Sequence, residues 1–128
     1  MSTPLSDAEL LAAADVVSAR AYAPYSNVHV GCAVLARDGR VIEGVNVENA
    51  AYPLGVCAER TALSRAVAEG YGPGDFAVAA ITASPCGGCR QWLLEMGIDR
   101  VVFRSLGRVV TMTPGELLPE AFDSSGLR

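Results

Sequence analysis

Lysine is missing from this chain, in which all ten basic residues are arginine. Fourteen acidic residues leave a formal net charge of −4, and there is one histidine, His29. Proteins that grip long phosphate backbones need clustered cationic side chains, and dispersed arginines on an acidic chain do not supply them. The composition therefore predicts no polynucleotide partner, and any substrate related to nucleic acids should be small.

Long apolar runs and a secretion signal are missing as well. One of the longest apolar runs, Phe76 to Ile81, has the length of a strand and not of a membrane helix. The first nine residues lack the basic start and apolar centre of a signal peptide. We therefore expect a cytoplasmic protein without a membrane partner, in which cysteines are thiols by default.

The composition favours a folded globular chain. Hydrophobic residues make up 51% of the sequence, which is too many for a disordered chain. The 13 glycines and seven prolines indicate many turns but show no collagen-like period. A length of 128 residues predicts one domain over 1–128.

Helical and strand patterns alternate along the sequence. Ser6 and Glu9 have the spacing of a capping box, ahead of a helix that should reach about Tyr22. The patterns predict strands at 28–35, 41–47, 76–82, 100–104 and 109–113, and further helices at 56–69, 88–96 and 114–118. This alternation predicts an α/β fold, a three-layer α/β/α sandwich around a mixed five-stranded sheet.

Three of the four cysteines lie at the starts of two predicted helices. Cys57 precedes one, and Cys86 and Cys89 open the next with two glycines between them. A helix N-terminus favours the thiolate that binds metal, and a two-residue gap lets both sulfurs reach one ion. Three protein ligands leave the fourth position of tetrahedral zinc open for water, which is the catalytic pattern. An even number of cysteines would also fit disulfides, but so apolar a chain does not need them.

Two other residues could complete a four-ligand structural site. Cys32 alternates with Val30 and Val34 on one face of its predicted strand, which indicates a small core residue. His29 points to the opposite face and has no partner at ligand spacing. We therefore expect neither to bind metal.

Charged residues adjoin the three cysteines. Three thiolates on a divalent ion leave a net charge of −1, which Arg60 and Arg90 could offset by donating hydrogen bonds to the sulfurs. The alternative is that both are ordinary surface arginines. Glu59 is the candidate proton carrier, although a solvent-facing glutamate at a helix start fits its spacing equally well.

The ordered set of motifs resembles the small zinc-dependent cytidine deaminases that act on free nucleosides. Six segments carry the resemblance, at 21–26, 30–31, 44–52, 57–63, 85–91 and 117–122. It implies hydrolytic deamination of cytidine and 2′-deoxycytidine to uridine and 2′-deoxyuridine, with release of ammonia, in pyrimidine salvage. It also implies a zinc-bound hydroxide that attacks C4 of cytosine, with Glu59 shuttling the protons.

The resemblance further implies a role for individual residues. Cys57, Cys86 and Cys89 would hold Zn²⁺, Asn46 and Glu48 would bind the ribose, and the backbone of Ala58 and of Ser84 or Pro85 would meet the base. Phe122 would reach the base in a neighbouring subunit, and Tyr52 would lie at subunit contacts of a homotetramer. A C-terminal core anchor is the alternative for Phe122.

Two features depart from the family pattern. Val28 stands where the family usually has a phenylalanine that lines the nucleoside pocket. The segment 81–84, ahead of Cys86, is a few residues shorter than is typical. We expect a looser pocket than the family average.

Several other functions remain to be weighed. A deaminase of a modified cytosine nucleoside, such as blasticidin S, is the nearest. A polynucleotide deaminase usually has histidine in place of Cys57 and a basic surface. A redox protein would need a thioredoxin-like βαβ start around Cys86 and Cys89, and a structural zinc module would need Cys32 as its fourth ligand.

Overall fold

The computed structural model describes residues 5–127. Its sheet consists of β1 (Gly31–Ala36), β2 (Val41–Val45), β3 (Phe76–Ile81), β4 (Arg100–Ser105) and β5 (Arg108–Met112). The helices are α1 (Asp7–Ser18), α2 (Ala58–Ala68), α3 (Gly87–Glu95) and α4 (Pro114–Leu117), with the short 3₁₀ turns η1 (Tyr52–Leu54) and η2 (Ser124–Leu127). Each helix and strand predicted from the sequence is confirmed. Their bounds differ most at the end of α1, which is at Ser18 instead of about Tyr22, and at the start of β1, which excludes residues 28–30.

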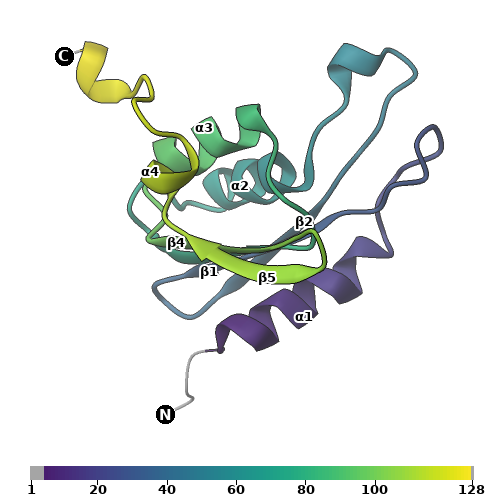
Figure 1. Cartoon of the computed structure of the whole chain (residues 1–128), viewed down its shortest axis with the longest axis horizontal. Coiled ribbons are helices and arrows are strands. Elements are labelled where there is room, and N and C mark those ends of the chain that lie inside the picture. Colours follow the sequence, from purple (N-terminus) through teal and green to yellow (C-terminus); the bar gives the residue numbers. More distant parts are fainter. Residues whose placement is uncertain (1–4, 128) are drawn as a thin grey trace.

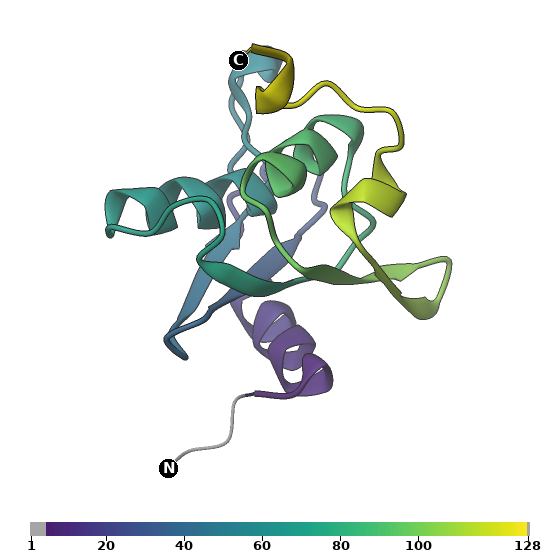
Figure 2. The ribbon, with the colours of Figure 1, turned by 90° about the vertical axis from the view of Figure 1, so that its left-hand side faces the viewer.

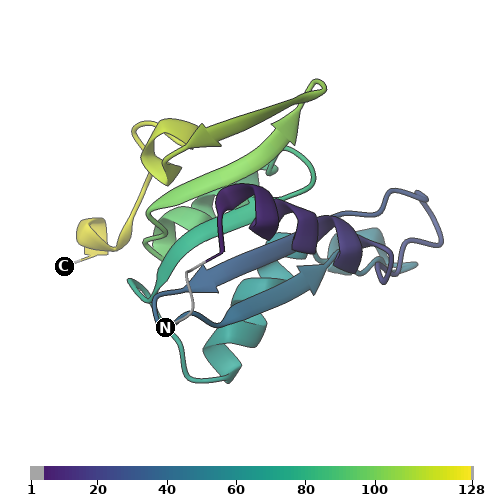
Figure 3. The same ribbon diagram turned by 90° about the horizontal axis from the view of Figure 1, so that it is seen from below.

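The sheet is mixed and its five strands lie in the order β2-β1-β3-β4-β5, which Figure 3 shows from the α1 side. Only β3 and β4 pair in parallel, and α3 forms the connection between them. The other neighbours pair antiparallel, with β1–β2 and β4–β5 as hairpins. The predicted mixed five-stranded sheet is therefore confirmed.

Helices cover both faces of the sheet, as Figures 1 and 2 show, with α1 on one side and α2 and α3 on the other. Leu10 and Ala14 of α1 pack in one core cluster. Leu63 of α2 and Leu93 of α3 belong to the cluster on the opposite face. All six residues of β1 are buried because their side chains alternate between the two clusters. This is the expected three-layer arrangement.

Two glycines let helices approach the sheet closely. A Cβ on Gly31 would lie 1.9 Å from the carbonyl oxygen of Ala14 in α1. A Cβ on Gly44 would lie 2.4 Å from the backbone nitrogen of Ala62 in α2. The close packing of α2 on β2 fixes where the N-terminal end of α2 lies, and with it the side chains of its first turn.

Three loop segments pair with one another beyond the end of the sheet, on the right of Figure 1. Tyr22 forms a bridge with Val47, and Val47 forms a second bridge with Val56. The rings of Tyr25 and Tyr52 meet edge to face, with 6.1 Å between their centroids. This pairing brings residues 46–48 next to the start of α2. Among the helices of residues 5–127, none is long and apolar enough to span a membrane.

Candidate active site

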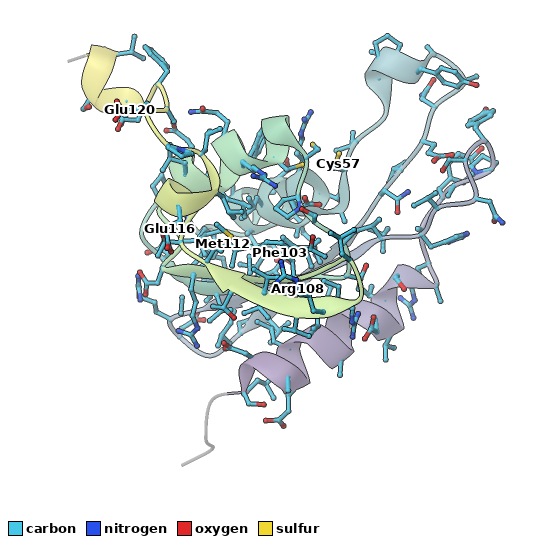
Figure 4. The ribbon with its side chains drawn as sticks, viewed as in Figure 1. Cys57, Phe103, Arg108, Met112, Glu116 and Glu120 are labelled. Carbon is cyan, nitrogen blue, oxygen red and sulfur yellow. The ribbon has the colours of Figure 1, made fainter. Side chains whose placement is uncertain are left out.

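A cavity of about 350 Å³ opens where the N-terminal ends of α2 and α3 meet the end of β3. The residues that line it are Ser26, Val28, Val30, Asn46, Glu48, Cys57, Ala58, Glu59, Ile81, Ala83, Ser84 and Cys86. In Figure 4, Cys57 marks its position at the edge of the helical layer. The cavity thus gathers most of the site residues expected from the sequence, although they come from widely separated segments.

Three cysteine sulfurs lie together beside this cavity. Those of Cys57, Cys86 and Cys89 all lie within 4.8 Å of one another, and Cys57 Sγ is 3.8 Å from Cys86 Sγ. Cys57 is the N-cap of α2, Cys86 is the N-cap of α3, and Cys89 lies in the first turn of α3. Tetrahedral zinc with Zn–S bonds of about 2.3 Å would separate two sulfurs by about 3.8 Å. The arrangement therefore fits a zinc ion.

Burial opposes ionisation of all three thiols, and for two of them it prevails. It raises the pKa of Cys57 and of Cys89, and the charge of Glu59 adds to the effect. Burial also opposes ionisation of Cys86, but hydrogen bonds from the backbone and the thiol of Cys89 lower its pKa. A set of crowded sulfurs of this kind needs positive charge nearby.

Arg60 supplies positive charge beside the sulfurs. Burial opposes its charge, but a hydrogen bond with Cys89 and attraction to the three cysteines raise its pKa. Its Nε is buried and has no hydrogen-bond partner among the residues that the structure describes. Arg60 therefore lies close enough to the three cysteines to interact with their charge.

Arg90 differs from the expectation. Its Nε donates to the carbonyl oxygen of Pro85 at 2.9 Å, and its Nη1 donates to that of Leu117 at 2.9 Å. Its Nη2 donates to Ser84 Oγ at 3.4 Å. These bonds tie the start of α3 to the end of α4, so Arg90 supports the loop that carries Cys86 instead of donating to sulfur. The sequence could not reveal this, because Leu117 is far away along the chain.

Glu59 is the one buried charged residue among residues 5–127, with 3% of its surface exposed. Burial raises the pKa of its carboxyl group, and hydrogen bonds with its own backbone and with Cys89 oppose the rise. The solvent-facing alternative for Glu59 is therefore wrong. A carboxyl group whose pKa is raised in a cavity is suited to accepting and returning a proton.

Asn46 holds two backbone groups at the rim of the cavity. Its Oδ1 accepts from Val30 N at 2.8 Å, and its Nδ2 donates to Val28 O at 2.8 Å. The side chain takes the place of a neighbouring strand beside residues 28–30, which explains why β1 begins only at Gly31. One acceptor site on Oδ1 and one N–H of Nδ2 remain for a ligand.

Glu48 lies near Asn46 and accepts three hydrogen bonds from one turn. Its Oε1 accepts from Tyr25 N at 3.0 Å and from Ser26 N at 3.1 Å, and its Oε2 accepts from the Ser26 hydroxyl. These bonds lower the pKa of Glu48, and the bond from the Ser26 hydroxyl has the largest effect. The carboxylate therefore stays charged.

The remaining expected residues are divided between the cavity and the surface. Val28, with 58% of its surface exposed, and the buried Ala58 both line the cavity. Phe122 is 65% exposed and is not among the lining residues, and its carbonyl oxygen accepts from Gln91 Nε2 at 2.7 Å. Its segment lies with Glu120, on the opposite side of α3 from Cys57 in Figure 4. The core-anchor alternative for Phe122 is therefore wrong.

Cys32 and His29 lie as the sequence predicts. Cys32 is fully buried in the core cluster between the sheet and α2, and His29 is exposed. Neither belongs to the cysteine cluster, which is the one potential metal-binding group found among residues 5–127.

Sequence reasoning gave no role to four residues that line the cavity, which are Ser26, Val30, Ile81 and Ala83. Three are apolar and would pass for core residues. Ser26 and Glu48 also line a second cavity of about 410 Å³, whose wall includes Tyr25 and Tyr52. Ser26 lies in the segment 21–26 that carries the family resemblance, and this is the one signal in the sequence that could have singled it out. The partner of Ser26, Glu48, cannot be deduced from spacing.

Comparison with known proteins places these features in a family. Residues 5–105 match the model of the cytidine and deoxycytidylate deaminase zinc-binding region. A cytidine deaminase from Halalkalibacterium halodurans is 43% identical over 84% of this chain and 86% of its own length. One from Sporosarcina psychrophila is 40% identical over 93% of each chain. The crystal structure of a cytidine deaminase from Burkholderia pseudomallei superimposes with a TM-score of 0.86 at 45% identity, over 92% of this chain and 100% of that one.

The sequence, the fold and the site agree. The match, over residues 5–105, spans the helix starts that carry the three cysteines and Glu59. The sulfur spacing fits the zinc ion that the matching region binds. This chain belongs to the zinc-dependent cytidine deaminase family.

Proposed function

We propose that this chain hydrolyses the 4-amino group of cytidine and 2′-deoxycytidine, giving uridine or 2′-deoxyuridine and ammonia. The observation that carries the proposal is the cluster of three sulfurs within 4.8 Å of one another, beside the buried carboxyl group of Glu59. The two relatives and the solved structure described above are named cytidine deaminases, which favours plain cytosine nucleosides over a modified one such as blasticidin S.

Cys57, Cys86 and Cys89 would hold the zinc ion through their sulfurs, with Arg60 offsetting the negative charge of the thiolates. A bound zinc ion supplies Lewis acidity, which brings the pKa of water close to neutrality. Arg90 would keep the loop ahead of Cys86 in place through its bonds to Pro85 and Leu117.

Glu59 would carry every proton in the reaction. Its carboxylate accepts a proton from the attacking water and passes it to N3 of the base as the new C–O bond forms at C4. It then takes the remaining hydroxyl proton and delivers it to the amino group, so that the C–N bond breaks and ammonia leaves. A buried carboxyl group with a raised pKa supports this alternation between charged and neutral forms.

Asn46 and Glu48 would bind the sugar hydroxyls, and the backbone of Ala58 would meet the polar edge of the base. Each of the two side chains keeps free hydrogen-bonding capacity facing the cavity. Val28 would leave more room beside the base than an aromatic residue does. A small nucleoside fits a cavity of about 350 Å³, and a polynucleotide gains nothing from an acidic surface.

We further propose a homotetramer in which Phe122 completes the site of a neighbouring subunit. The exposed ring of Phe122, outside the cavity of its own chain, supports this arrangement. Exposed apolar side chains on the paired loops, among them Tyr22, Tyr52 and Leu54, offer further contact surface. Sedimentation velocity of the wild type beside Phe122→Ala would separate a loss of assembly from a loss of activity.

The remaining proposals concern the setting of the enzyme. Residues 1–128 would form a single deaminase domain that works in the cytoplasm, where zinc-binding cysteines stay reduced. Its physiological role would be pyrimidine salvage, because deamination converts cytosine nucleosides into uracil nucleosides. Assaying pyrimidine nucleoside pools in cells with and without the gene product would test that role.

The test of the reaction is the loss of cytosine absorbance with cytidine and 2′-deoxycytidine, with the wild type beside Glu59→Gln. We expect turnover by the wild type and a loss of at least about 100-fold in the variant, because proton transfer contributes about that much or more. Zinc content measured on the same samples is the control, and it should be equal in both. A wild type that holds zinc but converts neither nucleoside would contradict the proposal.

A further inference from the structure

The turn before residue 28 is built around the carboxylate of Glu48. Two backbone amides, those of Tyr25 and Ser26, donate to Oε1, and the Ser26 hydroxyl donates to Oε2. The same hydroxyl oxygen accepts from Val28 N at 3.0 Å. Ser26 Oγ thus links the carboxylate to the backbone of a residue that lines the cavity.

The three bonds leave Glu48 with little freedom to rotate and little capacity to accept. A carboxylate has about four acceptor sites, two on each oxygen. Oε1 uses both of its sites for amides, and Oε2 uses one for the Ser26 hydroxyl. The carboxylate therefore offers one further acceptor site, on Oε2, and the orientation of that site depends on where the Ser26 hydroxyl holds Oε2.

We propose that Ser26 is a positioning residue, whose hydroxyl holds Glu48 so that the one free acceptor site on Oε2 meets a sugar hydroxyl of the bound nucleoside. The inference rests on the proposed function and adds to it the group that orients the carboxylate. Ser26 and Glu48 both line the cavity that contains Cys57 and Glu59, so the carboxylate and the reacting base share one space.

The loop does not depend on the Ser26 hydroxyl alone. Asn27 N donates to Ala23 O at 3.0 Å, and Asn46 holds both Val28 O and Val30 N. The backbone amides of Tyr25 and Ser26 would still reach Oε1 if the hydroxyl were removed. Removing it should therefore release Oε2 and leave the turn in place.

The experiment compares Ser26→Ala, Ser26→Thr and wild type on two substrates. Cytidine presents the sugar hydroxyls, whereas 2′,3′-dideoxycytidine has the same base and neither secondary hydroxyl. We expect Ser26→Ala to raise KM for cytidine about tenfold, with kcat within about twofold. The reason is that the hydrogen bond between the sugar hydroxyl and the charged Glu48 carboxylate is lost in the bound state. KM for dideoxycytidine should stay within about twofold, and Ser26→Thr, which keeps a hydroxyl, should restore KM for cytidine.

Two further measurements complete the test. Calorimetric binding of uridine should weaken by the same factor as KM rises, independently of turnover. Ser18→Ala is the matched control, since Ser18 also makes a local hydrogen bond, to Asp15 O at 2.6 Å, but lies in α1 away from the cavity. Its kinetics should match the wild type.

The inference is overturned if Ser26→Ala leaves cytidine KM unchanged, or if KM rises equally for both substrates, because an equal rise would mean a purely structural role. Either result leaves the proposed deaminase function standing, provided that the wild type converts cytidine. A wild type that neither converts cytidine nor binds uridine would overturn the proposed function and the inference together.

Discussion

Arg60 occupies the space beside Gly88: a Cβ built on Gly88 would lie 2.3 Å from Arg60 Nη2. The atom that would have to move is the far end of a flexible side chain, so Gly88→Ala should fold but displace the guanidinium. Because we propose that this guanidinium offsets the charge of the three sulfurs, we expect Gly88→Ala to bind zinc at least several-fold more weakly and to lose activity. Zinc affinity is measured by competition with a chromogenic chelator.

The neighbouring glycine provides the matched control. A Cβ on Gly87 meets nothing within 4 Å, so Gly87→Ala should keep the zinc affinity and activity of the wild type. Both positions lie in the first turn of α3, so any gain in helix propensity is shared. Equal zinc affinity in the two variants would show that Arg60 does not need its present position.

Val28 lines the cavity in which we propose that the base lies. An aromatic ring in its place could stack on the pyrimidine, and base–aromatic stacking is worth about 1–3 kcal/mol. We therefore expect Val28→Phe to lower KM for cytidine about fivefold or more, with less effect on kcat. Val28→Leu is the control, since it adds volume without a ring and should change KM by no more than about twofold. An unchanged KM in Val28→Phe would mean that residue 28 does not face the base.

Much of this site can be predicted from the sequence because its signals are local. Cys57, Cys86 and Cys89 mark helix starts, and the two-residue gap between Cys86 and Cys89 indicates a shared ion whatever the fold. The three layers of the fold can be predicted for the same reason, because the strands and helices are recognised from hydrophobic periodicity, which is itself a local property.

What the sequence could not predict depends on side chains that meet across long separations. Residues 28–30 have a strand pattern, yet the Asn46 side chain pairs with them in place of a strand. Arg90 looks like a charge partner for sulfur and instead donates to Leu117, which is 27 positions away. Ser26 has a role through Glu48, 22 positions away. Such contacts follow from packing, which periodicity does not encode.

Two ion pairs connect α1 to β4, Asp7 with Arg100 and Asp15 with Arg104. Eight residues of helix span about 12 Å and four residues of strand span about 13 Å, so both pairs can form at once. The hydrogen bond with Arg100 lowers the pKa of Asp7 below its usual 3.8. Because the folded-state pKa is lower than the unfolded one, this pair stabilises the protein above pH 3.8, and the stabilisation is lost as the pH falls through the folded pKa.

Asp7→Asn should therefore lower the free energy of unfolding at neutral pH by up to about 1 kcal/mol, as exposed ion pairs do. The difference from the wild type should disappear in acid, where the carboxyl group of Asp7 is protonated. Urea unfolding at a series of pH values measures the loss of stability at neutral pH and its disappearance in acid. In a double-mutant cycle with Arg100→Gln, a coupling energy of zero at neutral pH would show that the pair contributes nothing.

Leu106 lies at the tip of the β4–β5 hairpin with a φ of 52° and 95% of its surface exposed. The next residue, Gly107, also has a positive φ, of 79°, and turns of this kind favour Asn-Gly. A leucine in the left-handed region costs about 1–2 kcal/mol, and no burial offsets that cost in the isolated chain. We therefore expect Leu106→Asn to raise the melting temperature by a few degrees at constant activity.

Calorimetry of Leu106→Asn beside Leu106→Ala separates the effect of the exposed apolar atoms from the effect of the positive φ. Alanine removes the exposed apolar atoms but does not favour a positive φ, so it should stabilise less than asparagine. If Leu106→Asn instead lowers the melting temperature, and does so more strongly at low protein concentration, the leucine is buried against another copy of the chain. Backbone strain at residue 106 would then be tolerated because of that contact, and the hairpin tip would belong to the subunit interface.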